Sequence, residues 1–217
     1  MLILSRIFRC QPLLLPALAF CASALLSGPI LAQAPPPAPA SPTPAPPIAA
    51  PTTPDINRPS ADASTGREVE LQPQPMIRLR GQSTWDDGFE TLKKAIKTLE
   101  EDARRLGLAP VGQPKAHFIS SDDLGFTFEA FLPLAAPPAP GLAFSQGVEA
   151  GVSPAGRAMY FTHEGPYEEI DAAYEAITAF MEEKSLAYTG KFLEEYLVLP
   201  EKSDDPGMKL NIYVFLR

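Results

Sequence analysis

Proline is distributed so unevenly along the chain that it divides the sequence into two parts. Of the 26 prolines, 11 fall in the 25 residues from Pro35 to Pro59. This stretch has few large apolar side chains, so packing cannot offset the conformational entropy that its folding would cost. The part that can fold is about Met76 to Arg217, roughly 140 residues, a length that suits one domain with its own core.

The N-terminal residues have the three-part layout of a secretory signal peptide. Two arginines precede an apolar run from Leu13 to Leu26, and small residues that end in Ala32-Gln33-Ala34 follow it. We expect cleavage after Ala32, because cleavage after Ala34 would place a proline next. One alternative is an uncleaved anchor, since residues 13–31 are nearly long enough to span a bilayer. The other is lipid attachment at Cys21, although Phe20 is bulky where a bacterial lipobox has a small residue.

The sequence thus predicts three parts: a signal peptide at residues 1–32, a disordered Pro/Ala-rich linker at 33–66, and one domain at 67–217. The linker has the composition of a semi-extended, polyproline-II-prone spacer. Both cysteines lie within residues 1–32, so a cleaved chain has no thiol for a disulfide, a nucleophile or a metal site. We expect a periplasmic or secreted protein, membrane-anchored if the signal peptide is retained.

Acidic charge is concentrated in the part that folds. Residues 1–75 hold four basic and four acidic side chains, so the whole formal charge of −8 belongs to residues 76–217. A field of this sign repels phosphate backbones. We therefore expect no nucleic-acid binding by this chain alone.

Two helical patterns occur in the acidic part. The first has apolar side chains at alternating spacings of four and three from Trp85 to Leu106, and Ser83 with Asp86 predicts a capping box before it. The second begins at Gly165-Pro166 and has an apolar stripe from Tyr167 to Met181. The Leu-Ala-x-x-Gly segments that follow the two helices are 78 residues apart.

Strand patterns surround both helices in the same order. They lie at residues 76–80, 115–120, 126–132, 157–163, 191–199 and 209–216. The residues from 133 to 156 form a Pro/Gly-rich connection between the two sets. The chain thus predicts an α+β fold of tandem strand-helix-strand-strand units, with pseudo-twofold symmetry. We expect an antiparallel sheet with both helices on one face, and a ligand cleft where the units meet.

Five short segments, in this order, resemble the signatures of the GyrI-like (gyrase-inhibitor-like) small-molecule-binding domain, which is also the effector-binding domain of AraC-type and MerR-type regulators. They are residues 112–118, 128–133, 165–170, 194–196 and 211–214. The resemblance covers residues 76–217 and implies the same doubled fold. It departs from the family at Asn211, where a Glu is usual, and at Phe215, where a Pro is usual. A signal peptide and a linker stand where a regulator has its helix-turn-helix.

The resemblance implies a ligand site around Glu194, because the family's Glu-x-Tyr strand places this carboxylate at the centre of an aromatic cleft. A carboxylate in such a cleft favours a cation. Strand alternation places Glu194 and Tyr196 on one face and Glu195 on the other, although a one-residue bulge would exchange the two glutamates. A solvated sheet face is the competing interpretation of Glu194. The full set of candidate ligand-binding residues is Glu194, Tyr196, Phe118, Tyr160 and Trp85.

We expect no metal site and no cofactor. His117 and His163 are the only histidines, and nothing at ligand spacing accompanies either of them. The sequence has no phosphate-binding glycine loop and no nucleophile elbow. Taken singly, each candidate aromatic is better explained by core packing than by ligand contact, above all Trp85 and Tyr167 on the helix stripes.

Three functions remain open. The first is an exported domain that captures a small cationic or amphipathic molecule in the aromatic cleft. The second is a hydrolase of small electrophiles in which Glu194 acts as general base and Tyr196 donates a hydrogen bond. The third is an interaction domain with a closed cleft on a proline-rich stem. The first hypothesis makes catalysis unnecessary, so the protein is more readily explained as a binding module than as an enzyme.

Cleavage after Ala32 predicts a mature chain that begins at Gln33. Intact-mass measurement of the protein recovered from the exported fraction of a bacterial cell tests this. A mass that includes residues 1–32 would indicate the uncleaved anchor, and a lipid-sized excess on Cys21 would indicate acylation.

Overall fold

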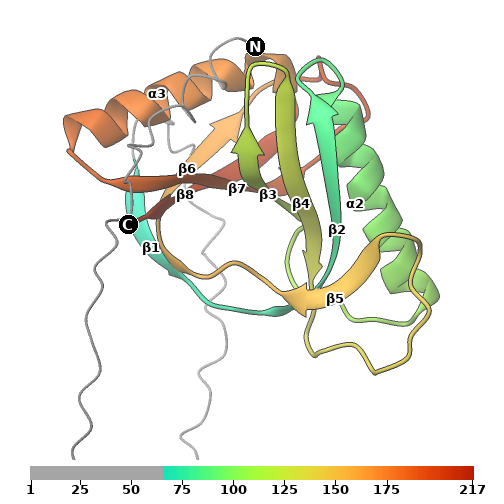
Figure 1. The fold of residues 1–217 in the computed structure, drawn as a ribbon. Helices are drawn as coiled ribbons and strands as arrows, with labels where there is room; N and C mark the ends of the chain where they lie inside the picture. Colours follow the sequence, from blue (N-terminus) through green and yellow to red (C-terminus); the bar gives the residue numbers. More distant parts are fainter. Residues whose placement is uncertain (1–65) are drawn as a thin grey trace, which may run out of the picture. The chain divides into compact units, whose positions relative to one another are not determined.

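The computed structural model describes residues 66–217 and shows two helices and eight strands (Figure 1). The predicted signal peptide and, apart from Gly66, the predicted linker lie outside the described residues. In chain order the elements are β1 (Arg67–Leu71), β2 (Pro75–Thr84), α2 (Gly88–Arg105), β3 (Lys115–Ser121), β4 (Gly125–Pro133), β5 (Val148–Val152), β6 (Gly156–Glu164), the 3-10 turn η1 (Tyr167–Glu169), α3 (Ile170–Glu183), β7 (Tyr188–Val198) and β8 (Lys209–Leu216). Neither helix of residues 66–217 is long and apolar enough to cross a membrane.

The strands form one antiparallel sheet in the order β1-β6-β8-β7-β3-β4-β2-β5. Strands β2, β4 and β3 belong to the first predicted unit and β6, β8 and β7 to the second, and the units meet where β3 pairs with β7. Both helices pack on the same face of the sheet, in one core cluster. The α+β fold of tandem strand-helix-strand-strand units is therefore confirmed.

The two units repeat each other closely. The buried apolar residues of α2 include positions 92, 95, 96, 99 and 103, and those of α3 are positions 170, 173, 174, 177 and 181. Each member of the second set follows its counterpart in the first by 78 residues, the same offset as between the Leu-Ala-x-x-Gly segments. A fixed offset of this kind is the mark of an internal duplication. It identifies the counterpart of any residue in these helices and the strands that follow them.

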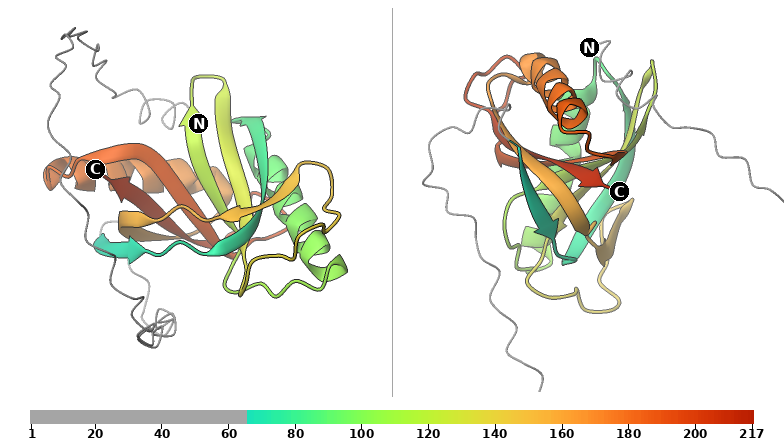
Figure 2. Two further views of the ribbon diagram at one scale, coloured as in Figure 1. Left: turned by 60° about the horizontal axis from the view of Figure 1, so that its bottom comes forward. Right: turned by 90° about the vertical axis from the view of Figure 1, so that its left-hand side faces the viewer.

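Two strands were absent from the sequence prediction. β1 lies next to β6, and β5, which falls in the predicted connection, lies next to β2. The segment that joins β1 to β2 lies beside the segment that joins β5 to β6, and the backbone N–H of Ser153 donates there to the carbonyl oxygen of Gln74 at 2.8 Å. This hydrogen bond links the β1–β6 pair to the β5–β2 pair. The sheet consequently curls strongly, as Figure 2 shows. Both strands are only five residues long and mostly exposed, so each has too few apolar positions for its alternation to be distinctive.

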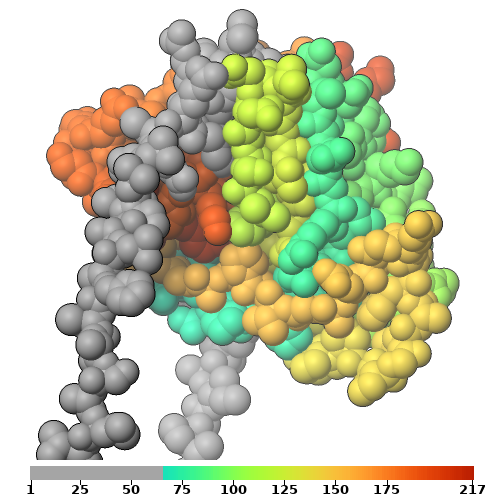
Figure 3. Space-filling view, viewed as in Figure 1, coloured from blue at the N-terminus to red at the C-terminus, as the bar shows by residue number. Residues whose placement is uncertain are grey.

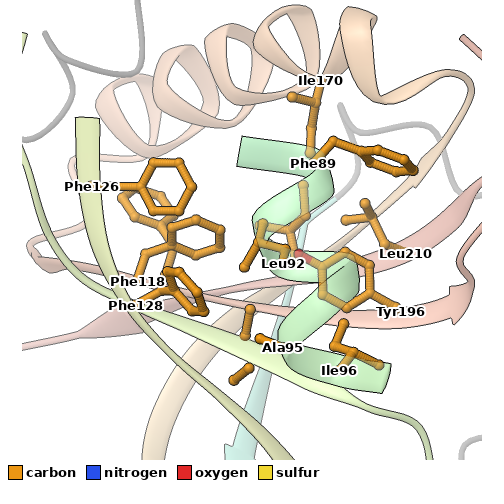
Figure 4. Close-up of a cluster of buried hydrophobic side chains, with 14 of the residues drawn as sticks. Phe89, Leu92, Ala95, Ile96, Phe118, Phe126, Phe128, Ile170, Tyr196 and Leu210 are labelled. Atoms are coloured by element: carbon orange, nitrogen blue, oxygen red, sulfur yellow. The ribbon is translucent and has the colours of Figure 1, made fainter. Parts of the chain in front are cut away.

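The curled sheet buries side chains on both of its faces. The face toward the helices contributes to the larger core, part of which Figure 4 shows. The opposite face carries a smaller cluster of six buried residues: Met76, Phe131, Ala158, Leu193, Tyr213 and Phe215. Because adjacent residues of a strand point to opposite faces, neighbouring side chains on β7 enter different environments.

The predicted capping box before the first helix is wrong. Strand β2 continues to Thr84, which pairs with Gly125, and α2 begins only at Gly88, so Ser83 lies too far before the first turn to cap it. The Ser83 hydroxyl donates instead to Thr91 Oγ1 at 3.0 Å. The helix begins at Gly88, and the hydroxyl of Thr84 donates to Asp87 just before it. The second helix begins with η1, so that Pro166 precedes the first turn.

The connection from β4 to β5 is fastened to α2 by a buried carboxylate. Asp102, 1% exposed, accepts hydrogen bonds from the backbone N–H and the hydroxyl of Ser145, both at 2.7 Å. Arg105 bridges this carboxylate and the carbonyl oxygen of Ala143. The connection therefore lies on the surface beside α2, as Figure 3 shows in yellow.

Replacing Gly125 tests the close approach of β2 and β4. A Cβ at this position would lie 2.0 Å from the carbonyl oxygen of Ser83, so the backbone would have to move. We expect Gly125→Ala to lower the free energy of unfolding by about 1–3 kcal/mol in urea denaturation. Leu124→Ala is the control, because Leu124 is 81% exposed. Equal stabilities of the two variants would contradict the packing described.

Candidate functional site

Glu194 lies at the junction of the two units and points toward the helices. Within the sheet it is flanked by Ala116 on β3 and Ile212 on β8, and the pairing of β3 with β7 is regular here. The strand alternation predicted from the sequence therefore holds, with no bulge between the two glutamates. Glu194 is 1% exposed, so the competing interpretation of a solvated sheet face is wrong.

Two tyrosines hold the Glu194 carboxyl group. The Tyr174 hydroxyl, from α3, donates to Oε1 at 2.7 Å, and the Tyr196 hydroxyl, two residues along β7, donates to Oε2 at 2.5 Å. Both tyrosines are 2% exposed. The ring of Tyr174 also meets Phe192 edge-on, with centroids 5.2 Å apart. Each oxygen of the buried carboxyl group thus has a hydrogen-bond donor, within an aromatic environment.

No basic side chain balances the charge of this carboxylate: among residues 66–217, no ion pair joins Glu194 to a lysine, arginine or histidine. Burial therefore dominates and raises the pKa of Glu194 to about 7, while the hydrogen bonds from Tyr196 and Tyr174 act in the opposite direction. Burial, together with the Glu194 charge, raises the pKa of both tyrosine hydroxyls above its usual value. The carboxyl group is thus poised to change its protonation state near neutral pH.

The polar group is present in the second unit only. Residues 78 positions before Tyr174, Glu194 and Tyr196 are Ile96, Ala116 and Phe118, all apolar and all buried. The duplication consequently has one polar site and one apolar counterpart. Close packing does not require a polar group at these positions, since the first unit is packed without one.

The sequence analysis did not include Tyr174 among the candidate site residues, because it fits the apolar stripe of the second helix. The 78-residue comparison would have found it, since Tyr174 is the polar counterpart of Ile96. A hydroxyl in place of an aliphatic side chain on a buried stripe needs a partner, and that partner is Glu194.

Four of the five predicted site residues share the helix-facing core: Glu194, Tyr196, Phe118 and Trp85. Phe118 and Trp85 both pack on Phe126, with centroids 5.2 and 5.1 Å away, and the Trp85 indole donates to the carbonyl oxygen of Asp122. Tyr160 belongs to the opposite face and donates to Asn211 Oδ1 at 2.9 Å. The structure therefore does not bring Tyr160 together with Glu194.

Glu195 occupies the opposite face in a fully different environment. Lys115 pairs with its Oε1 at 2.7 Å, while Asn211 and Tyr213 donate to its Oε2 at 2.7 and 2.8 Å. Burial alone would raise the pKa of Glu195, but the charge of Lys115 and these hydrogen bonds together hold it below its ordinary value. The charged form of Glu195 is thus favoured and has its hydrogen bonds, in contrast to that of Glu194.

His117 lies on the opposite face from this site, whereas His163 pairs with Leu210, the β8 residue that also pairs with Tyr196. His117 pairs with Leu193 across the sheet, and burial lowers its pKa to about 4. Within the described part of the chain, no three His, Cys, Asp or Glu side chains are grouped so as to hold a metal ion.

The doubled strand-helix-strand-strand fold, with a carboxyl group buried where its units meet, is that of a small-molecule-binding domain. The chain belongs to the GyrI-like small molecule binding domain family, whose match covers residues 66–217. This confirms the resemblance found in the sequence. No curated protein sequence matches the chain.

Several solved structures are similar in fold. A hydrolase encoded by lin2189 from Listeria innocua has a TM-score of 0.56 at 14% identity and is matched over 71% of this chain and 92% of its own. The C-terminal domain of EcmrR has a TM-score of 0.58 at 16% identity, over 70% and 97%. EcmrR in a complex with DNA has a TM-score of 0.57 at 16% identity, but only 56% of its length is matched. At such identities these likenesses show the fold alone.

Replacing Glu194 tests its elevated pKa through the pH dependence of stability. Between the ordinary pKa of 4.5 and about 7, the folded chain keeps a proton on Glu194 that the unfolded chain releases. The free energy of unfolding therefore falls as pH rises through this range, by up to about 3 kcal/mol from this group. We expect Glu194→Gln to lack this loss, so that urea denaturation at a series of pH values favours the variant increasingly toward pH 7. Parallel pH profiles of the wild type and the variant would contradict the assignment.

Proposed function

We propose that the domain captures a small lipophilic cation, with Glu194 as its charge partner. The observation that carries this proposal is a fully buried carboxyl group that has two tyrosine donors and no basic partner in residues 66–217. Such a group is unfavourable when ionised and has no structural need for its charge. A cation bound beside it would supply the missing counter-charge.

The aromatic surroundings suit the same ligand. Tyr174 and Tyr196 meet the carboxylate through their hydroxyls, and Phe192 lies edge-on against Tyr174. A desolvated cation gains about 0.5–2 kcal/mol from each aromatic face that it meets. Apolar parts of the ligand would pack on the same rings, so the chemistry favours an amphipathic cation over a small hydrated one.

We also propose that this capture takes place outside the cytoplasm. The sequence pattern of a signal peptide followed by a proline-rich spacer supports this location. A semi-extended spacer would hold the domain away from a membrane or cell wall, whether or not the signal peptide is removed.

Calorimetric titration with tetraphenylphosphonium, a permanent lipophilic cation, tests the proposed function. We expect the wild type to bind it and Glu194→Gln to bind at least about tenfold more weakly, because loss of the charge removes more than about 1.4 kcal/mol. Glu195→Gln changes the neighbouring carboxylate on the opposite face, and Glu175→Gln changes an exposed one on α3. Both controls should keep wild-type affinity. Absence of wild-type binding, or equal binding by Glu194→Gln, would contradict the proposal.

A second candidate function is hydrolysis of a small electrophile. The observation that favours it is the elevated pKa of Glu194, which a general base near neutral pH requires. In this reaction Glu194 would take a proton from water while the water oxygen bonds to a carbon of a strained ring. The ring bond to the leaving atom would break, and the Tyr196 hydroxyl would stabilise or protonate that atom.

Turnover of an epoxide panel, followed by chromatography, tests this second function. We expect Glu194→Gln to abolish turnover and Tyr196→Phe to reduce it, while Glu195→Gln retains it. Turnover that survives Glu194→Gln would remove the assignment.

A further inference from the structure

Two further residues that are related by the 78-residue offset contact each other. Phe89 lies in the first turn of α2 and Tyr167 is the first residue of η1, and the two are 78 positions apart. Their rings touch, with centroids 5.3 Å apart. Phe89 belongs to the same buried cluster as Ile170 and Tyr196, as Figure 4 shows.

Pseudo-twofold symmetry fixes where this pair lies. A contact between a residue and its own counterpart can only lie on the symmetry axis. Glu194 and its counterpart Ala116 are also direct neighbours, across β3 and β7. The axis therefore runs from the Glu194–Ala116 pair in the sheet to the Phe89–Tyr167 pair between the first turns of the two helical segments.

Tyr167 is the member of this pair that reaches the surface. It is only partly buried, whereas Glu194, Tyr174 and Tyr196 are almost fully buried. Its hydroxyl lies against Gly88, where an added Cβ would be 3.2 Å from the hydroxyl oxygen. Burial of the hydroxyl raises its pKa, and the charge of Glu194 raises it further.

The local backbone would let Tyr167 move without breaking the core. η1 is a single 3-10 turn, closed by a hydrogen bond from the Glu169 N–H to the Pro166 carbonyl oxygen. It follows Gly165, whose φ of 146° lies where residues with a side chain are strained. The Ile170 N–H donates to the Tyr167 carbonyl oxygen and so joins the turn to α3, and a movement of the Tyr167 side chain alone would leave α3 and the sheet pairing in place.

The ring face of Phe89 already receives a cation. The Lys93 ammonium group lies 5.2 Å from the centre of the Phe89 ring and also pairs with Glu90. The aromatic pair on the axis thus accepts positive charge at its outer side. A cationic ligand would meet the same kind of surface on its way to Glu194.

We propose that Phe89 and Tyr167 form the gate of the Glu194 site, through which a lipophilic cation passes along the pseudo-twofold axis. The ligand displaces Tyr167 and then packs against both rings. This inference rests on the proposed function, since a gate has a role only if a ligand reaches Glu194. Tyr167 then governs the association rate, because binding that requires a side chain to move is slower than docking on a preformed surface.

Stopped-flow measurement of tetraphenylphosphonium binding to the full chain tests the gate with variants of opposite effect. We expect Tyr167→Ala to raise the association rate constant about tenfold and Tyr167→Phe, which keeps the ring, to leave it near the wild-type value. Gly88→Ala narrows the space beside the Tyr167 hydroxyl and should lower the rate constant. Phe180→Ala is the control, because it removes a ring of α3 that packs on Phe161, away from the axis.

The outcomes separate the gate from the proposed function. Binding by the wild type with the same association rate in Tyr167→Ala and Gly88→Ala overturns the gate alone. An association rate constant that rises as much in Phe180→Ala as in Tyr167→Ala also overturns the gate, because the effect would then be a general loosening of the core. Absence of wild-type binding overturns the gate together with the proposed function. If Tyr167→Ala fails to fold, a lowered rate in Gly88→Ala supports the gate and an unchanged rate overturns it.

Discussion

The chemistry of this domain depends on the free-energy cost of burying a carboxyl group in an aromatic core without a basic partner. Glu194 is tolerated because its hydrogen bonds to Tyr174 and Tyr196 satisfy both oxygens, and because its neutral form remains accessible near neutral pH. The one thing that the described chain does not supply is a positive charge. A cation bound beside Glu194 would supply that charge, which is the role that we propose for the site.

Duplication explains how the fold accommodates such a group. The first unit has Ile96, Ala116 and Phe118 at the equivalent positions, so the same place in its core is packed with apolar side chains. The small side chain of Ala116 lies directly beside Glu194 in the sheet. The apolar unit stabilises the fold, while its polar counterpart holds the site.

Much of this arrangement could be predicted from the sequence, because apolar periodicity and element order report burial on one face. The two helices and six of the strands were found in this way, and strand alternation placed Glu194 and Tyr196 on one face with Glu195 on the other. The edge strands β1 and β5 were not found, because they are mostly exposed and have weak patterns. Tyr174 was hidden within an apolar stripe, and the placement of Tyr160 on the opposite face depends on a sheet register that single-strand patterns do not give.

Proton release on cation binding tests the central claim most directly. Calorimetry in two buffers of different ionisation enthalpy measures the number of protons that leave when tetraphenylphosphonium binds. If a neutral Glu194 ionises as the cation arrives, close to one proton is released per cation below the elevated pKa, and release fades well above it. Binding without proton release at every pH would show that the carboxyl group is already charged, and would contradict the account.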